Sequence, residues 1–174
     1  MKKSLNLWQL AGFIFTGVAG VLLHFLFEWT GKSIFVAPFA AVNESIWEHM
    51  KLLFVPMFLF AFIENKYFKM YDEFWCVKLA GVLMGTVLVP VLYYTLNGIF
   101  GPTSGWVNIA IFFASAAVAF LTETTIFKNG IKCKYPYAAL TVLCVIALLF
   151  AVFTFAPPHI PLFRDPVMGG YGIV

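Results

Sequence analysis

The sequence predicts an all-α protein: a polytopic transmembrane bundle of about five helical spans. Of its 174 residues, 62% are hydrophobic and only 11% are charged, and the mean hydropathy is +0.92. Soluble domains carry about 25% charged residues, and the 21 Phe side chains would coat a water-soluble version in apolar surface. The composition therefore excludes a soluble globule. We expect the lipid bilayer as a partner and no nucleic acid.

Five stretches have the roughly 20 apolar residues that cross a hydrocarbon core of about 30 Å. In order, they cover residues 7–29, 46–63, 74–96, 106–127 and 137–156. The first stretch contains His24 and Glu28 and lacks a small-residue cleavage site, so we expect a retained span rather than a signal peptide. The bundle thus covers residues 1–156, and a separate tail rich in proline covers 157–174.

Turn-forming or charged segments separate the spans. They are a connection with Gly-Lys-Ser and Ala-Pro-Phe, a charged loop over 64–73, the turn Gly-Pro-Thr-Ser-Gly at 101–105 and a basic loop over 128–134. Inside the spans, Pro56 predicts a kink. The spacing of Gly81 and Gly85 predicts close helix packing in the third span.

The distribution of lysine and arginine predicts the orientation, because cytoplasmic loops retain positive charge. With the N-terminus inside, the inner side holds Lys2, Lys3, Lys66, Lys69, Lys78, Lys128, Lys132 and Lys134, and the outer side holds Lys32, Lys51 and Arg164. Five spans then place the tail outside. We expect a multi-pass protein of the bacterial cytoplasmic membrane, with Glu123 reaching the cytoplasmic interface or a hydroxyl neighbour rather than serving as a proton relay.

The three cysteines, Cys76, Cys133 and Cys144, show no C-x-x-C spacing. An odd number cannot close into a complete set of disulfides. We expect three free thiols.

Three segments bring histidines and carboxylates to the outer half of the predicted bundle. They are the end of the first span (His24, Glu28), the start of the second (Asn43, Glu44, Glu48, His49, Lys51) and the tail (His159, Arg164, Asp165). His24 and Glu28 are four residues apart and therefore share one helix face. Because charged groups at membrane depth avoid lipid, this face should point toward the other helices.

Imidazole with carboxylate is a ligand set suited to Zn²⁺, Fe or Mn. We therefore predict a divalent-metal site, with Zn²⁺ favoured as the cofactor. Its predicted ligands are His24, Glu28, His49, His159 and Asp165, with Glu44 or Glu48 as general base and Asn43, Lys51 and Arg164 as contacts to a ligand. A catalytic zinc needs three protein ligands and an open position for water.

Two other interpretations of the same residues stay open. The site could bind a small polar ligand or a proton without metal. Alternatively, ion pairs such as Glu48 with Lys51 and Arg164 with Asp165 could simply fasten the tail to the helix ends.

Two motifs carry a resemblance to known proteins. Asn-Glu-Ser-Ile-Trp-Glu-His at 43–49 and Pro-Pro-His-Ile-Pro-Leu-Phe-Arg-Asp-Pro at 157–166 resemble an uncharacterised family of small five-span bacterial membrane proteins. That resemblance implies a cytoplasmic-membrane location and a common site for both segments. More distantly, the chain is similar to membrane hydrolases related to alkaline ceramidase, which implies zinc-site roles for His24, His49, His159, Asp165 and Ser45.

Three functions follow as hypotheses. The first is a metal-dependent hydrolase that acts on a lipid-type substrate at the outer leaflet. The second is a transporter or binding protein for a cation or small solute, for which a homo-oligomer could supply the symmetry missing from five spans. The third is a non-catalytic membrane subunit.

Overall fold

The computed structural model describes residues 2–68, 71–102 and 104–173, and it is all-helical over these ranges. The helices are α1 (Lys2–Trp29), α2 (Ile46–Asn65), α3 (Phe74–Phe100), α4 (Gly105–Asn129) and α5 (Pro136–Phe155), followed by the 3₁₀ turn η1 (Pro161–Phe163). All five α-helices are long and apolar enough to cross a membrane, which confirms the predicted fold class. Lys69 and Thr103, which belong to predicted connections, lie outside the described residues.

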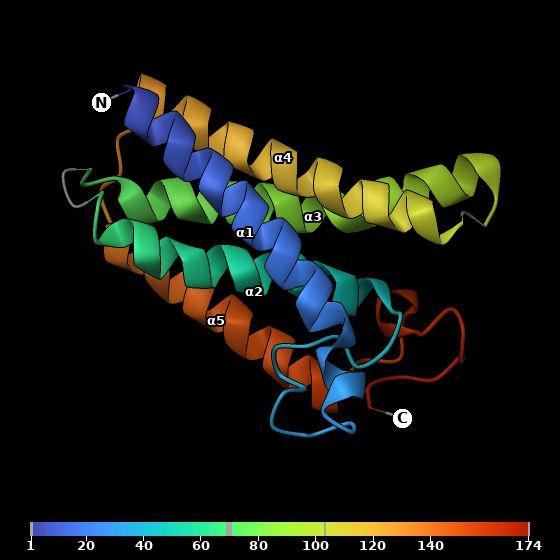
Figure 1. Ribbon diagram of the computed structural model, residues 1–174. Coiled ribbons are helices and arrows are strands. Elements are labelled where there is room, and N and C mark those ends of the chain that lie inside the picture. Colours follow the sequence, from blue (N-terminus) through green and yellow to red (C-terminus); the bar gives the residue numbers. More distant parts are fainter. Residues whose placement is uncertain (1, 69–70, 103, 174) are drawn as a thin grey trace.

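The bundle is built around α2 and α3. As Figure 1 shows, α1 crosses α2 and α4, α4 runs along α3, and α5 lies along α2 and α3 on the side away from α4. Helix α2 has the largest buried share of the five, 67% of its apolar window. The two chain termini lie at opposite ends of the bundle, as five consecutive spans require. We call these the N-terminal end and the C-terminal end of the bundle.

Local sequence sets most helix boundaries. Ser45 caps α2 by accepting a hydrogen bond from the backbone N–H of Glu48 at 3.4 Å. Pro136 opens α5, where a missing N–H costs nothing. Gly101 and Gly130 follow α3 and α4 with φ of 79° and 71°, a conformation that glycine adopts without strain. Helix α3 continues four residues beyond its predicted end, to Phe100.

The predicted close-packing glycines lie at the contact between α3 and α4. The backbone of Gly81 touches the side chain of Glu123, and Gly85 faces Ala119 and the carbonyl of Ser115. Because glycine has no Cβ, the two helices can approach each other closely here.

The expectation for Glu123 is wrong. Glu123 does not reach an interface: its side chain is fully buried and its Oε2 accepts a hydrogen bond from Lys78 Nζ at 2.6 Å. Glu64, expected in the charged loop over 64–73, and Lys78, expected on the inner side, are also buried and form an ion pair. The ends of the spans were predicted from hydropathy. Hydropathy does not distinguish a lysine that points to water from a lysine that points to a carboxylate on a neighbouring helix.

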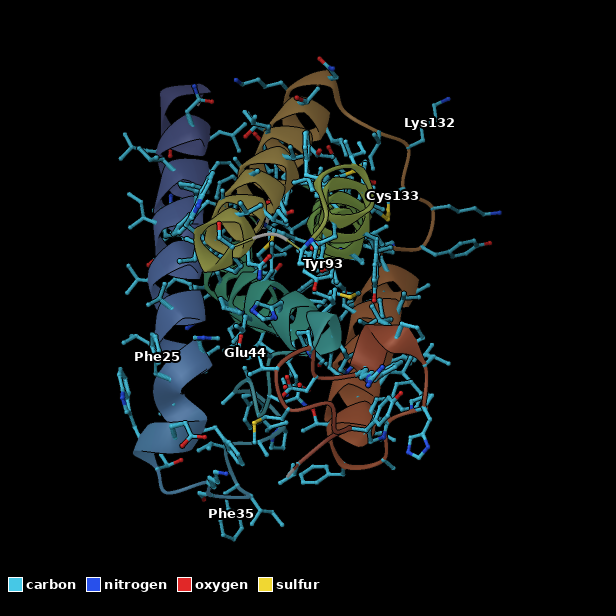
Figure 2. All side chains as sticks on the ribbon, turned by 90° about the vertical axis from the view of Figure 1, so that its right-hand side faces the viewer. Phe25, Phe35, Glu44, Tyr93, Lys132 and Cys133 are labelled. Carbon is cyan, nitrogen blue, oxygen red and sulfur yellow. A yellow bond between two sulfur atoms is a disulfide. The ribbon has the colours of Figure 1, made fainter. Side chains whose placement is uncertain are left out.

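The expectation of three free thiols is also wrong. Cys76 at the start of α3 and Cys133 in the connection between α4 and α5 (Figure 2) form a disulfide, and Cys144 remains free. The partners are 57 residues apart in sequence, but their Cα atoms are 6.2 Å apart. An odd number of cysteines leaves one unpaired and does not prevent the other two from meeting.

Candidate functional site

Three of the predicted site residues converge at the C-terminal end of the bundle. His24 Nε2 lies 3.5 Å from Glu44 Oε1, and His49 Nε2 lies 3.6 Å from Glu44 Oε2. One ligand atom from each residue can be chosen so that all three lie within 4.8 Å of one another. Two atoms that each stand about 2.1 Å from a tetrahedral zinc are about 3.4 Å apart, which is close to each imidazole–carboxylate distance, although the two distances involve different oxygens of Glu44.

Two helix ends and one loop position the three side chains. His24 lies near the end of α1, and His49 lies in the first turn of α2. Glu44 precedes the Ser45 cap in the connection between the two helices, and Figure 2 shows it between α1 and the start of α2. The His24 and His49 rings are 5.7 Å apart between centroids. The chain reversal after α1 thus brings a loop carboxylate between two helical imidazoles.

The backbone fixes the orientation of His49. Its Nδ1 lies 2.9 Å from the carbonyl oxygen of Ser45. A carbonyl oxygen can only accept, so Nδ1 is the donor in this contact, and Nε2 is the ring nitrogen that faces Glu44. Metal-binding histidines commonly have this arrangement, in which the second ring nitrogen donates to a carbonyl or carboxylate.

A cavity of about 310 Å³ adjoins the three residues between α1, α2 and α4. Its walls are mostly apolar, and they include Phe25, Ile109, Phe112 and Phe113. Apart from His24, Glu44 and His49, the polar side chain in the wall is Asn108, whose Oδ1 is buried without a partner among the described residues. The cavity is therefore largely apolar, and the amide of Asn108 on α4 is a polar group in its wall.

Asn108 is not among the site residues predicted from the sequence. A signal was available. Asn108, Ser115 and Glu123 recur at intervals of seven and eight residues in α4, and this spacing places them on one helix face.

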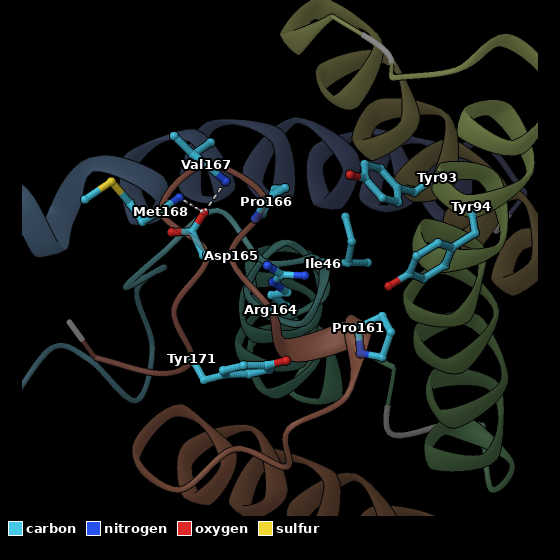
Figure 3. Close-up of a pocket in the computed structure, with 11 residues that line it drawn as sticks. Ile46, Tyr93, Tyr94, Pro161, Arg164, Asp165, Pro166, Val167, Met168 and Tyr171 are labelled. Atoms are coloured by element: carbon cyan, nitrogen blue, oxygen red, sulfur yellow. Dashed lines mark hydrogen bonds between the residues drawn. The ribbon is translucent and has the colours of Figure 1, made fainter.

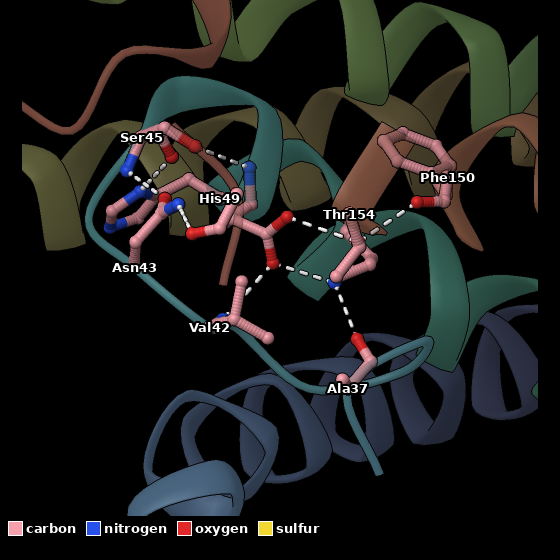
Figure 4. Close-up of polar contacts among 10 residues, drawn as sticks. Ala37, Val42, Asn43, Ser45, His49, Phe150 and Thr154 are labelled. Atoms are coloured by element: carbon pink, nitrogen blue, oxygen red, sulfur yellow. Dashed lines mark hydrogen bonds and ion pairs between the residues drawn. The ribbon is translucent and has the colours of Figure 1, made fainter. Parts of the chain in front are cut away.

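Glu48 and Lys51 lie in a separate buried network, shown in Figure 4. Lys51 Nζ pairs with Glu48 Oε2 at 2.6 Å and donates to the carbonyl of Ala37 and to Thr154 Oγ1, both at 2.8 Å. Glu48 also accepts from the backbone N–H of Val42 at 3.1 Å. These contacts tie the start of α2 to the preceding loop and to α5. They do not bring either side chain to the cavity, so Glu48 is not positioned as a base there.

Glu28, predicted as a ligand beside His24, is exposed and is not part of the cluster. The spacing of four residues puts His24 and Glu28 on one side of α1, but Glu28 lies in the last turn of the helix, where its side chain is exposed. The carboxylate that meets His24 comes from the following loop.

The tail does not contribute its predicted ligands to the cluster. His159 is exposed and its ring packs on Tyr171 with centroids 4.6 Å apart. Asp165 is buried, and its Oδ1 accepts hydrogen bonds from the backbone N–H groups of Val167 at 2.7 Å and Met168 at 3.2 Å. Asp165 thus closes a turn of the tail itself. The ion pair predicted between Arg164 and Asp165 is not found in the described part of the chain.

Asn43 fastens the tail to the start of α2. Its Nδ2 donates to the carbonyl of Gly172 at 2.8 Å, while its Oδ1 accepts from the backbone N–H of Ser45 at 2.9 Å. Phe163 adds an apolar contact, since it is buried against Trp47 with ring centroids 4.7 Å apart. The tail therefore packs on α2 and α5 beside the cluster.

Arg164 lines a second cavity of about 560 Å³ between the tail and α3. Figure 3 shows Arg164 in this cavity opposite Tyr94, with Tyr171 and Pro161 on the tail side. This cavity shares no residue with the one beside His24. None of the predicted contacts Asn43, Lys51 and Arg164 lines the cavity beside His24.

The comparisons with known proteins agree with one resemblance and give no support to the other. Neither the curated proteins nor the solved structures contain a match to this chain, and nothing found supports the analogy to alkaline ceramidase. A family model, in contrast, matches nearly all of it, as the motifs at 43–49 and 157–166 predict. The chain belongs to a family of unknown function, DUF6512, whose model matches residues 1–173.

Proposed function

We propose that this protein is a membrane metalloprotein that holds one divalent transition-metal ion, with Zn²⁺ favoured, through His24, Glu44 and His49. The observation that carries the proposal is the approach of three ligand atoms to within 4.8 Å of one another. The contact of His49 Nδ1 with the Ser45 carbonyl supports it, because this contact orients the ring with Nε2 toward the other two residues.

The ligand set and the cavity favour catalysis over a purely structural metal. Two histidines and one glutamate leave a fourth position open, as in catalytic rather than structural zinc sites. The adjoining cavity of about 310 Å³ is lined largely by aromatic and aliphatic side chains, which suits an acyl chain. We therefore propose a metal-dependent hydrolase that acts on a lipid-type substrate.

The roles of the residues follow from their positions. A metal ion held by His24, Glu44 and His49 would lower the pKa of a bound water, which would supply the nucleophile. Asn108 on the cavity wall can orient a substrate carbonyl or hydroxyl group through its amide. Glu44 is needed as a ligand, and Glu48 is held by Lys51, so neither is proposed as a separate general base.

The lysine distribution supports an orientation with the N-terminal end in the cytoplasm. In this orientation the cluster faces the outer side of a cytoplasmic membrane, and the substrate would enter from the outer leaflet.

A second candidate, transport of a cation, is favoured by one observation. The N-terminal half of the bundle contains two buried carboxylates, Glu64 and Glu123, in addition to the cluster at the other end. Acidic groups buried within membrane helices often mark ion pathways.

Metal analysis of purified protein tests the proposal. Wild-type protein should bind about one zinc per chain, and His24→Ala and His49→Ala should each lower the affinity by at least about tenfold, a loss comparable to those seen when metal sites are perturbed. His159→Ala is the matched control, because His159 is exposed and its ring packs on Tyr171 of the tail. Folded wild-type protein without stoichiometric zinc, or an equal loss in His159→Ala, would contradict the metal site.

Two activity assays distinguish the candidates once metal binding is established. A hydrolase should release product from lipid esters in micelles, and Asn108→Leu should slow this release without lowering zinc occupancy. A transporter should instead take up zinc into proteoliposomes without consuming the lipid.

A further inference from the structure

Three charged side chains meet in the N-terminal half of the bundle, and each comes from a different helix. Glu64 of α2, Lys78 of α3 and Glu123 of α4 are 0%, 1% and 0% exposed. Lys78 Nζ donates to Glu123 Oε2 at 2.6 Å and forms an ion pair with Glu64 Oε2. From α1, Gln9 Nε2 donates to Glu64 Oε1 at 3.2 Å.

The charges of this cluster do not balance. Two carboxylates face one ammonium group, so a fully ionised cluster carries one net negative charge in the interior of the bundle. Gln9 from α1 is neutral, and the rings of Phe74 and Phe120 face the ammonium group at 5.7 and 5.9 Å. Among the described residues, Lys51 is the other buried cation, and Glu48 holds it at the opposite end.

Burying an uncompensated charge in a membrane bundle is costly. Two carboxyl groups that share a site avoid this cost when one of them binds a proton. Glu123 Oε1 and Gln9 Oε1 are both buried acceptors without a hydrogen-bond partner in the described chain. A proton on Glu123 Oε1 would turn that buried, unpaired acceptor into a hydrogen-bond donor.

We infer that Glu64 and Glu123 share one exchangeable proton beside Lys78, which makes this cluster a proton-binding site within the membrane-spanning part of the protein. The step is a simple acid dissociation: the O–H bond of one carboxyl group breaks, its electron pair stays on the oxygen and the proton passes to water. The inference does not depend on a metal at His24, Glu44 and His49.

Buried polar side chains lead from the cluster toward the cavity at the other end. Ser115 and Asn108 precede Glu123 by eight and fifteen residues on one face of α4, or by about 12 and 22 Å along the helix. Thr86 follows Lys78 by eight residues on α3. The side-chain oxygens of Ser115, Thr86 and Asn108 are buried without partners in the described residues. Such groups can solvate water or a proton in transit, which is why we expect the bound proton to exchange.

Infrared spectroscopy of the purified protein in lipid nanodiscs tests the inference by counting protonated carboxyl groups. At neutral pH, wild-type protein should show the C=O band of one buried carboxylic acid, and the band should shift after transfer to D₂O. Either Glu64→Gln or Glu123→Gln should abolish the band, because one carboxylate then balances Lys78. Lys78→Met should leave two protonated carboxyl groups and so double the band.

The controls separate this site from the proposed metal centre and from other carboxyl groups. Glu28→Gln removes an exposed glutamate and His24→Ala removes a metal ligand, and both should keep the wild-type band. A wild type without the band, a band that survives in both glutamine variants, or a band that never shifts in D₂O would overturn the inference. If Lys78→Met fails to fold, the wild type and the two glutamine variants still decide it.

Discussion

Gly81 of α3 lies directly against the side chain of Glu123 on α4, so closely that a Cβ at position 81 would overlap Glu123 Cγ and Oε1. The buried ion pair between Glu123 and Lys78 therefore depends on the absence of a side chain on the helix that carries the lysine. Helix packing and the placement of a buried charge are here a single structural feature.

We expect Gly81→Ala to destabilise the protein by about 1–3 kcal/mol, the usual cost of inserting atoms into a packed core. The new methyl group would push Glu123 away from Lys78. Unfolding in detergent measures the change. Gly98→Ala on the same helix is the control, because no heavy atom lies within 4 Å of a Cβ built there. Equal stability of the two variants would show that Gly81 is not needed for the placement of Glu123.

We expect Lys51→Met to cost about 3–5 kcal/mol, because it leaves Glu48 buried and unpaired. The double variant Glu48→Gln with Lys51→Met should recover part of this loss, since it removes the uncompensated charge. Lys66→Met, at an exposed lysine just after α2, is the control. The same unfolding measurement applies, and a Lys51→Met protein as stable as Lys66→Met would contradict the structural role of the pair.

Glu44 and Glu48 should respond differently to the same substitution, although they lie four residues apart. Glu44→Gln should lower zinc affinity by at least about tenfold, as expected on weakening a metal site. Glu48→Gln should leave the affinity unchanged and lower the stability instead, because Glu48 binds Lys51 and Thr154. Zinc titration by calorimetry measures both effects. A loss of affinity in Glu48→Gln alone would place the metal elsewhere.

Zinc affinity should fall as the pH is lowered through the range in which imidazole takes up a proton, because only the neutral ring can bind metal. With two histidine ligands, the loss below that range should be roughly hundredfold per pH unit. A His24→Ala variant that still binds weakly should show about half this slope on a logarithmic scale, while His159→Ala should match the wild type. An affinity that does not change with pH would exclude histidine ligands.

The disulfide provides a test of orientation. In the orientation proposed from the lysines, the N-terminal end lies in the cytoplasm, where thiols are kept reduced. We therefore expect Cys76 and Cys133 to react with a thiol reagent in rapidly quenched cells and to be protected after purification in air. Gel-shift alkylation measures this, with Cys144 as the internal reference in both samples. A pair that is already oxidised in cells would place the N-terminal end on the outer side.

Part of the site could be predicted from the sequence because its residues lie close together in it. His49 and Glu44 are five residues apart at the start of α2, so the short chain between them keeps the two residues near each other. The partner of His24 was predicted by helix spacing to be Glu28, yet it is Glu44. The four-residue spacing predicts contacts within one helix only. It could not predict that the loop after α1 folds back and brings Glu44 to His24.

The sequence by itself determined the five helices, because backbone N–H and C=O groups in lipid must pair within the same segment and apolar length alone then defines each span. Only the tertiary structure decided which polar side chains meet. Glu64, Lys78 and Glu123 come from three helices and meet because the rotation of each helix about its axis brings them to one point. Span length and hydropathy are unchanged by that rotation, so they could not reveal the meeting of these charges or separate His159 and Asp165 from His24.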